Sequence, residues 1–548
     1  MRYRLTILPI MALLLLLGWA GTIYTQAHSA RVEGEASIRK VYETILDRYV
    51  AEIDPAKLSD AAIAGMLREL DPYSQHIDDN NSYRLDALTT GEYGGVGIRL
   101  GRMNDSLIAI SPMDGTPAML QGVQAGDRII KIDSVWTKNL DLNEAARLVR
   151  GDKGSIVTLL IKRVGEAEPL RFDLIRELIK VPDVSYSGLI KDRTGYVKLS
   201  NFSKYSAEDL EKAIRKMNQG NMQALIIDVR GNPGGLLRAA LMSADLFIEQ
   251  GALLLETRGR VNKSNNQYVS RRRPIVRDDL PIAVLIDGGS ASASEILAGV
   301  LQDYDRAVVI GESSFGKGLV QTVTRLSPET RLKLTSAKYY LPSGRLIQKR
   351  EVAQDLLYED LLPPQDSTFK SDNNRTFEGG GGVEPDLVTE DFPLSPLERT
   401  LWRQRMFFKY ALAYDESNPG LSLPLRFEES IVDSFYNWMF LQNMLPPSKY
   451  ERWLDDLDEV VDSTSAIYPE LMNFKVALSD AKTTYARESF EKIRFQILAG
   501  LEREMARVLG GNGARIAASL QHDRVVQKAI EILGSEEMVH GILAGPED

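Results

Sequence analysis

The chain has 548 residues, 44% of them hydrophobic and 26% charged, which suits about three or four folded globular domains. Its formal net charge of −10 at pH 7 argues against a general nucleic-acid-binding protein. The sequence contains no cysteine, which excludes disulfide bonds, thiolate metal sites, a thiol nucleophile and a lipid anchor on cysteine.

Residues 1–30 predict export of the rest of the chain. Arg2 and Arg4 precede an uncharged, largely apolar run from Leu5 to Ala30. A basic start followed by an apolar run is typical of a signal peptide, and this run is also long enough for a retained membrane anchor. Both alternatives remain open.

Two units follow before the next buried strands. Residues 31–88 have apolar side chains at helical spacing and predict a helical region, with a turn at Leu70–Ser74. A glycine-rich loop, Gly94-Gly95-Val96-Gly97-Ile98, then leads into a strand. A phosphate-binding loop is disfavoured there, because such loops precede a helix. Three further strands are expected, at Leu107–Ser111, Arg128–Ile132 and Ile156–Arg163, and a helix is expected at Leu142–Val149.

A parallel α/β core is predicted downstream. The apolar strand Ala224–Val229 leads through a glycine-rich loop into a helix, and Pro281–Ile286 repeats this pattern. Sites in such sheets lie at the carboxyl ends of the strands. Gly234-Gly235 and Gly288-Gly289 both follow such ends, so we expect the two loops to face each other.

Ser292 lies where the second of these strands turns into a helix. Ser292 and Glu295 have capping-box spacing, so the serine is either a helix cap or a nucleophile beside backbone N–H groups that hold an oxyanion. No histidine lies between His76 and His522, which weakens a Ser-His-Asp triad without excluding it. Lysine is the other known base for serine, and Lys317 is the candidate.

A nucleotide-binding loop competes for the same lysine. Gly311–Lys317 fits Gly-x-x-x-x-Gly-Lys, but Gly318 replaces the required Ser or Thr. Leu319–Thr324 also has the pattern of a strand, where a nucleotide-binding loop needs a helix. We therefore expect no nucleotide, and because the sequence has no metal-ligand cluster we also expect no metal or other cofactor.

Several motifs together resemble the carboxyl-terminal processing proteases, the tail-specific serine peptidases of family S41, which contain a PDZ domain. The resemblance extends over about residues 37–388. The motifs that carry it are Leu70–Ser74, Glu92–Leu100, Val123–Ile132, Asp228–Gly235, Ser290–Ile296, Phe315–Gln321 and Gly381–Asp386.

The resemblance implies a role for each residue of the catalytic site. Ser292 is the nucleophile, Lys317 the general base, and Gln321 orients the lysine. Ser290 and Ser294 are expected to be packing or capping residues. The oxyanion hole is formed by the backbone N–H groups of Ala293 and of Gly234 or Gly235.

The resemblance also implies that the PDZ domain binds a substrate's C-terminus. Backbone N–H groups of the glycine loop hold the terminal carboxylate, and the peptide adds to the sheet as a strand. Arg150 helps to couple peptide binding to activation. The implied substrate-binding residues are Gly94, Gly95, Val96, Gly97, Ile98 and Arg150.

The predicted fold class is a multidomain α/β protein whose serine peptidase core is crotonase-like or Clp-protease-like. Trp402, Phe407 and Trp438 mark a C-terminal domain of helical periodicity, which we expect to pack against the protease, self-associate or dock an adaptor. The expected segments are the signal peptide or anchor 1–30, the N-terminal helical region 31–88, the PDZ domain 89–175, the S41 core 176–392 and the helical C-terminal domain 393–548.

These expectations describe a serine endopeptidase of the bacterial cell envelope, periplasmic or anchored in the inner membrane. Its partners are polypeptides with a free C-terminus, not nucleic acids. Two alternatives stay open: a catalytically silent PDZ scaffold that binds peptides, and an esterase on the same core. Intact Ser292, Lys317 and Gln321 argue against the scaffold, and the PDZ domain argues against the esterase.

Overall fold

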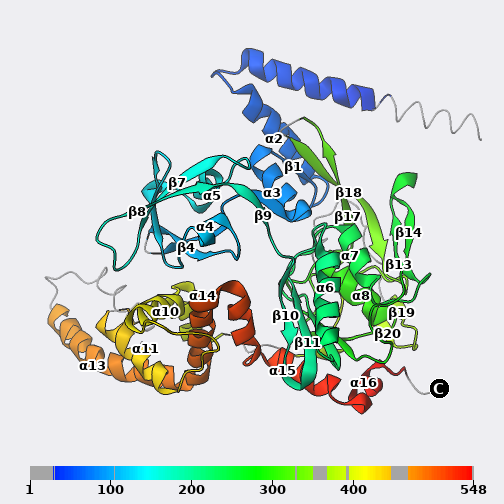
Figure 1. Cartoon of the computed structure of the whole chain (residues 1–548). Helices are drawn as coiled ribbons and strands as arrows, with labels where there is room; N and C mark the ends of the chain where they lie inside the picture. The colour runs from blue at the N-terminus through cyan, green and yellow to red at the C-terminus, as the bar shows by residue number, and fades with distance from the viewer. Residues whose placement is uncertain are drawn as a thin grey trace, which may run out of the picture. The chain divides into compact units, whose positions relative to one another are not determined.

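The structure is a computed structural model that describes residues 29, 31–103, 105–327, 330–349, 367–389, 394–442, 444–445 and 467–545 (Figure 1). Apart from Ser29, the predicted signal peptide or anchor lies outside these residues. Within the described part of the chain, no helix is both long enough and apolar enough to cross a membrane. The chain divides into two compact units. The first contains the described residues of Met1–Asp78 and Thr322–Thr335, and the second contains most of the remaining residues.

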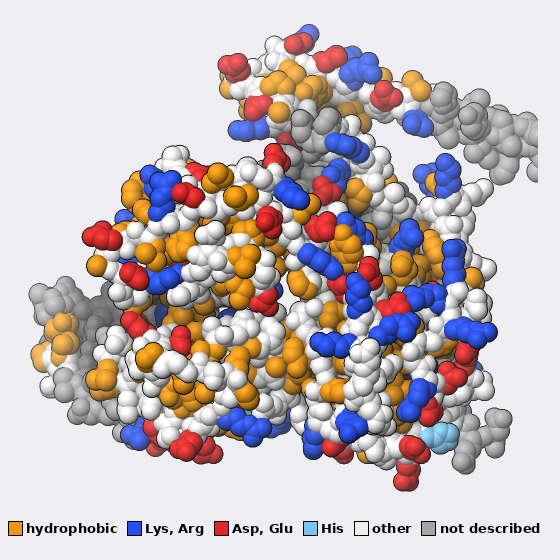
Figure 2. All heavy atoms as spheres, viewed as in Figure 1, with side chains coloured by type: hydrophobic (Ala, Val, Ile, Leu, Met, Phe, Trp, Pro, Cys, Tyr) orange, Lys and Arg blue, Asp and Glu red, His pale blue; other side chains and the backbone are white. Residues whose placement is uncertain are grey.

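The first unit is mainly helical, as predicted. Residues 31–48 form a helix, and α2 (Pro55–Arg68) begins where Asp54 accepts a hydrogen bond from the N–H of Ala56. In the predicted turn, Asp71 accepts hydrogen bonds from the backbone N–H groups of Tyr73 and Ser74. Strand β1 (Gln75–Ile77) then pairs with the start of β18 (Arg331–Tyr340). Several apolar side chains of these helices stay exposed, as Figure 2 shows, among them Val32, Ile38, Val41, Leu46 and Met66.

The second unit begins with α3 (Asp79–Thr90) and a PDZ-type sheet. Strand β2 (Glu92–Gly95) contains the first two glycines of the predicted loop and pairs antiparallel with β9 (Glu177–Lys180). The main sheet has the order β3-β4-β5-β7-β8, with β6 beside β5. Its elements are β3 (Ile98–Met103), β4 (Ser106–Pro112), α4 (Pro117–Leu120), β5 (Arg128–Ile132), β6 (Val135–Trp136), η1 (Thr137–Asn139), α5 (Leu142–Val149), β7 (Ile156–Lys162) and β8 (Leu170–Ile175).

The protease core is a six-stranded sheet in the order β10-β11-β12-β15-β16-β21. Only β10 is antiparallel to its neighbour, so the predicted parallel core is confirmed. Its elements are β10 (Val184–Leu189), η2 (Lys191–Arg193), β11 (Thr194–Leu199), α6 (Ser206–Gln219), β12 (Ala224–Asp228), α7 (Leu237–Ala244), β15 (Ile282–Ile286), α8 (Ala293–Asp303), β16 (Val308–Gly311) and β21 (Leu387–Val388).

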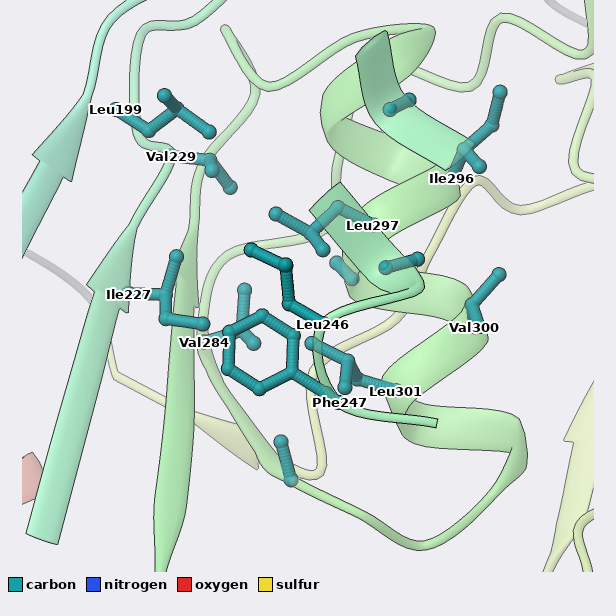
Figure 3. Close-up of a cluster of buried hydrophobic side chains, with 14 of the residues drawn as sticks. Leu199, Ile227, Val229, Leu246, Phe247, Val284, Ile296, Leu297, Val300 and Leu301 are labelled. Carbon is teal, nitrogen blue, oxygen red and sulfur yellow. The ribbon is translucent and has the colours of Figure 1, made fainter. Parts of the chain in front are cut away.

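Helices cover both faces of this sheet, which explains its continuously apolar strands. On one face, Ile227 and Val284 pack with α6, α7 and α8 (Figure 3). On the other face, Ile226 and Leu285 pack against the C-terminal helices α15 (Arg524–Leu533) and α16 (Glu536–Leu543). Smaller flanking strands are β13 (Leu253–Arg258), β14 (Asn266–Val269), β17 (Leu319–Arg325), β19 (Thr368–Lys370) and β20 (Thr376–Glu378), with η3 (Asn262–Ser264) between β13 and β14.

The C-terminal region is helical, as predicted, but it contributes to more than one core; Phe408, for example, packs with Ile108 and Ile110 of β4. Another is its own aromatic core, in which Phe407, Tyr410 and Phe435 pack together. Helix α14 (Arg494–Leu520) bends where Gly511 has a φ of +70°, and beyond this bend its residues join the core of the protease sheet. The remaining helices are α9 (Pro396–Arg403), α10 (Met406–Ser417), α11 (Ser430–Leu441) and α13 (Tyr468–Lys492).

Candidate active site

Ser292 occupies a strained turn between β15 and α8. Its φ of +54° is uncommon for a residue with a side chain, and such strain persists only where the surroundings impose it. The neighbouring residues are fixed to the loop after β12, because Ala291 N–H and Ser294 Oγ both donate to the carbonyl of Asn232, at 3.1 and 2.8 Å. Ser290 Oγ donates to the carbonyl of Val229 at 2.9 Å. Ser290 and Ser294 are therefore packing residues, as expected.

The two glycine loops face each other, which confirms that prediction. A Cβ on Gly234, whose φ is +97°, would lie 2.6 Å from the carbonyl oxygen of Ala291 and 2.9 Å from the nitrogen of Ala293. A Cβ on Gly289 would lie 3.0 Å from the Cα of Gly231. Only glycine allows the two loops to approach this closely.

Glu295 fixes the main chain on both sides of the site. Its carboxylate is fully buried and accepts hydrogen bonds from Ser292 N–H at 2.6 Å and Lys317 N–H at 3.0 Å. Gly316 N–H and Ser314 Oγ donate to its other oxygen, at 2.6 and 2.5 Å. Burial raises the pKa of Glu295 to about 7, against the opposing effect of these hydrogen bonds. The sequence indicated a capping box here, but not the link from Glu295 to Lys317.

Tyr339 provides a second link between the two predicted catalytic residues. It lies in β18, is fully buried, and its hydroxyl lies 2.5 Å from the carbonyl oxygen of Lys317 and 3.3 Å from that of Ser292. The structure thus brings the backbones of Ser292 and Lys317 together through one carboxylate and one phenol. The sequence analysis missed Tyr339, since its alternating strand pattern carries no chemical signal.

The other predicted residues have defined places. Lys317 is half-buried and lies two residues before the start of β17. Gln321 lies in β17 and donates to the carbonyl of Leu319 at 3.5 Å. The N–H of Gly234, one of the predicted oxyanion donors, donates to Asn232 Oδ1 at 2.9 Å. A Cβ on Gly235 would lie 2.2 Å from the carbonyl oxygen of Phe202, so this glycine is also required by close packing.

A buried ion network lies just upstream of the Gly234 loop. Asp228 receives hydrogen bonds from Arg230, Lys198 and Tyr196. Burial by itself would raise the pKa of Asp228, but Arg230 and Lys198 hold it well below its usual range. Arg230 also forms an ion pair at 2.7 Å with Asp523, the N-cap residue of α15. The C-terminal helices are therefore connected to the loop that contains the predicted oxyanion donors.

The predicted peptide site of the PDZ domain is a groove of about 270 Å³ between β3 and α5. Val96, Gly97 and Ile98 line it, together with Arg150. The guanidinium of Arg150 lies over the rings of Tyr83 and Tyr93, 5.1 and 5.9 Å from their centroids. A Cβ on Gly97 would lie 2.3 Å from the side chain of Thr116. The predicted residues thus meet at one groove, apart from Gly94 and Gly95, which lie in β2.

Four parts of the chain match known protein families. Residues 193–358 match peptidase family S41 and residues 109–163 match a PDZ domain. Residues 22–81 match the N-terminal domain of the activating protease CtpB. Residues 397–533, for which the sequence analysis found no family, match the C-terminal helical domain of probable PDZ-proteases. Among the described residues, no group of three or more His, Asp and Glu side chains is placed to hold a metal ion.

Known relatives are similar over most of their length. The carboxy-terminal-processing protease of Bartonella bacilliformis is 40% identical over 327 residues, which cover 59% of this chain and 74% of the relative. The carboxy-terminal processing protease CtpB of Bacillus subtilis is 35% identical over 330 residues, 60% of this chain and 68% of the relative. Among solved structures, the photosystem II D1 C-terminal processing protease is 25% identical, with a TM-score of 0.35 over 65% of this chain and 87% of that one. The chain belongs to the carboxy-terminal processing proteases, the PDZ-containing serine peptidases of family S41.

Proposed function

We propose that this peptidase cleaves exported polypeptides with a Ser292–Lys317 dyad and selects them by their free C-terminus. The observation that carries the proposal is that Glu295 and Tyr339 each contact the main chain of both Ser292 and Lys317. A nucleophile and its base need such a fixed mutual position.

In the proposed reaction, the neutral amine of Lys317 accepts the proton of Ser292 Oγ while the oxygen attacks the scissile carbonyl. Backbone N–H groups of Ala293 and of Gly234 or Gly235 stabilise the resulting oxyanion. If Gly234 serves, its N–H must leave Asn232 Oδ1, which it contacts in the described structure. The lysinium returns the proton to the leaving amine as the C–N bond breaks. Water then hydrolyses the acyl-enzyme, with Lys317 again acting as base, and Gln321 orients the lysine throughout.

In the PDZ domain, the substrate's terminal carboxylate binds the backbone N–H groups of the Gly94–Ile98 segment, and its chain extends along the groove beside β3. Arg150 borders this groove and contacts Tyr83 of α3 and Tyr93 of β2. This position supports a role for Arg150 in coupling peptide binding in the groove to activation of the protease.

Cleavage of an unstructured polypeptide, followed by mass spectrometry of the fragments, tests the catalytic part. Ser292→Ala, Lys317→Ala and Lys317→Arg should each abolish turnover, since arginine does not act as a base near neutral pH. Ser290→Ala, a packing serine two residues away, serves as the matched control. Wild-type turnover in Lys317→Arg would contradict the dyad. Cleavage of a simple ester but no peptide would favour the esterase, and peptide binding without any cleavage would favour the silent scaffold.

C-terminal selection is tested with one substrate in two forms. The free acid should be cleaved faster than the C-terminal amide, because amidation removes the charge that the backbone N–H groups bind. Equal rates for the two forms would overturn the proposed role of the PDZ groove.

We further propose that the protein works in the bacterial cell envelope, exported by residues 1–30. The basic and apolar pattern of that segment supports this location. Cell fractionation combined with N-terminal sequencing of the mature protein tests it and separates a cleaved signal peptide from a retained anchor. Recovery of an uncleaved protein only in the cytoplasm would contradict the location.

A further inference from the structure

A cavity of about 370 Å³ between the C-terminal helices and Ile110 of β4 has a strongly positive lining. Among the described residues that line it, four are arginines and one is a glutamate. The arginines come from two helices and the junction between α9 and α10: Arg403 ends α9, Arg405 precedes α10, and Arg503 and Arg507 lie on α14.

The single lining carboxylate is already engaged. Glu504 is almost fully buried, and its oxygens lie 2.9 Å from Nε of Arg507 and 3.8 Å from Nε of Arg503. Nε of Arg503 is buried and forms no hydrogen bond with any described residue. Its guanidinium stacks over the ring of Trp402, 4.7 Å from the centroid. Trp402 thus supports Arg503 from one side but provides no negative charge.

Two further arginines among the described residues add to this positive charge. Burial and the positive charges of Arg503 and Arg507 lower the pKa of Arg515 to about 10. Nearby, partial burial and Arg507 lower the pKa of Arg99, which Asp114 opposes. Arg503 and Arg507 are also one helical turn apart, a spacing at which like charges repel. A site that gathers cations at this cost is expected to receive an anion.

The backbone also favours a built site. Arg405 has a φ of +55° and a ψ of 35°, a left-handed conformation that is uncommon outside glycine. A Cβ on the neighbouring Gly101 of β3 would lie 3.1 Å from Nη1 of Arg405, so the guanidinium is closely packed. Strained residues persist where packing imposes them, and they are frequent at ligand sites.

We propose that this cavity, bounded by Arg403, Arg405, Arg503 and Arg507, binds a phosphate group. Guanidinium groups bind phosphate oxygens through paired N–H donors, and several arginines favour a multiply charged anion over a single carboxylate. The phosphate is either a free ion, such as phosphate or diphosphate, or the headgroup of an acidic lipid. This site is separate from the Ser292 site and does not depend on the proposed cleavage reaction.

Isothermal titration of the full chain with inorganic phosphate and with diphosphate, at constant ionic strength, tests the free-ion source. Arg503→Gln should weaken binding about tenfold, the effect of one lost charge-assisted hydrogen bond. Glu504→Gln should strengthen binding, because it removes the one negative charge at the wall. Arg399→Gln, on the exposed side of α9, is the matched control and should leave binding unchanged.

Flotation with phosphatidylcholine vesicles, with and without phosphatidic acid, tests the lipid source with the same three variants. Weaker binding by Arg503→Gln together with stronger binding by Glu504→Gln, in either experiment, supports the site. The experiment in which this occurs identifies whether the phosphate is a free ion or a lipid headgroup. Urea denaturation of each variant confirms that a loss of binding is not a loss of folding. No binding in either experiment, or equal binding by wild type, Arg503→Gln and Glu504→Gln, would overturn the proposal.

Discussion

Replacing Glu295 with glutamine should separate the activity of this protease from its stability. Four donors point at the two carboxylate oxygens, two at each. A glutamine offers one oxygen, so its NH2 group faces two donors in either orientation. Leaving two donors without an acceptor costs about 1–3 kcal/mol each. The same change removes the free-energy cost of burying an ionised carboxylate. The rise in the pKa of Glu295 from 4.5 to about 7 corresponds to a cost of about 3 kcal/mol.

These two effects partly offset each other, so we expect the unfolding free energy of Glu295→Gln above pH 7 to lie between about 1 kcal/mol above and about 3 kcal/mol below that of wild type. Turnover should fall at least about 100-fold, because a displacement of Ser292 relative to Lys317 on the order of 1 Å has that effect. Peptide cleavage and urea denaturation measure the two quantities. Glu312→Gln, an exposed glutamate of the same segment, is the control.

The pH dependence gives a further check. Since the folded state raises the pKa of Glu295, its protonation favours folding: this contribution is complete below about pH 4.5 and is lost as the pH rises through about 7. The stability of wild type relative to Glu295→Gln should therefore decline by about 3 kcal/mol across that window. Turnover should change in the opposite direction, since a protonated carboxyl has fewer acceptor positions for Ser292 and Lys317. Wild-type turnover in Glu295→Gln, or a stability difference that stays constant with pH, would refute the reasoning.

The remaining predictions concern single contacts. Tyr339→Phe removes the hydroxyl between the carbonyls of Lys317 and Ser292, and should lower kcat about tenfold at a stability cost of about 1 kcal/mol; unchanged kcat would contradict this. Asp523→Asn removes one partner of the buried Arg230 and should destabilise the protein by about 1–3 kcal/mol in urea, with slower turnover as the loop shifts; wild-type stability would show that Asp228 alone suffices. Arg150→Ala should reduce turnover more than peptide affinity, measured by anisotropy in a Ser292→Ala background, and equal losses would make Arg150 a simple binding residue.

Much of the molecule was predictable from local sequence. The apolar strands and the glycine loops follow from patterns within a few residues. The strand pattern of Leu319–Thr324, which argued against a nucleotide-binding loop, was also local, and the structure confirms this strand as β17. It was also predictable that the loops containing Gly234 and Gly289 face each other, because neighbouring parallel strands end at the same edge of a sheet. Ser292 was predicted as the nucleophile from its strand-to-helix turn, and Lys317 as its base because no histidine lies between His76 and His522; both roles stay predictions.

The tertiary structure decided three features that no local pattern contains. Tyr339 and the link from Glu295 to Lys317 depend on which strand lies beside the Ser292 turn. Helices α15 and α16 cover one face of the protease sheet. Amphipathic periodicity predicts only that one side of a helix is buried, and it does not identify the element against which that side packs. The arginine-lined cavity arises because two helices and the junction between α9 and α10 bring like charges together, and side-chain charge in a sequence does not indicate proximity. Local pattern thus determined the elements and the chemical groups, whereas long-range packing determined which of those groups meet.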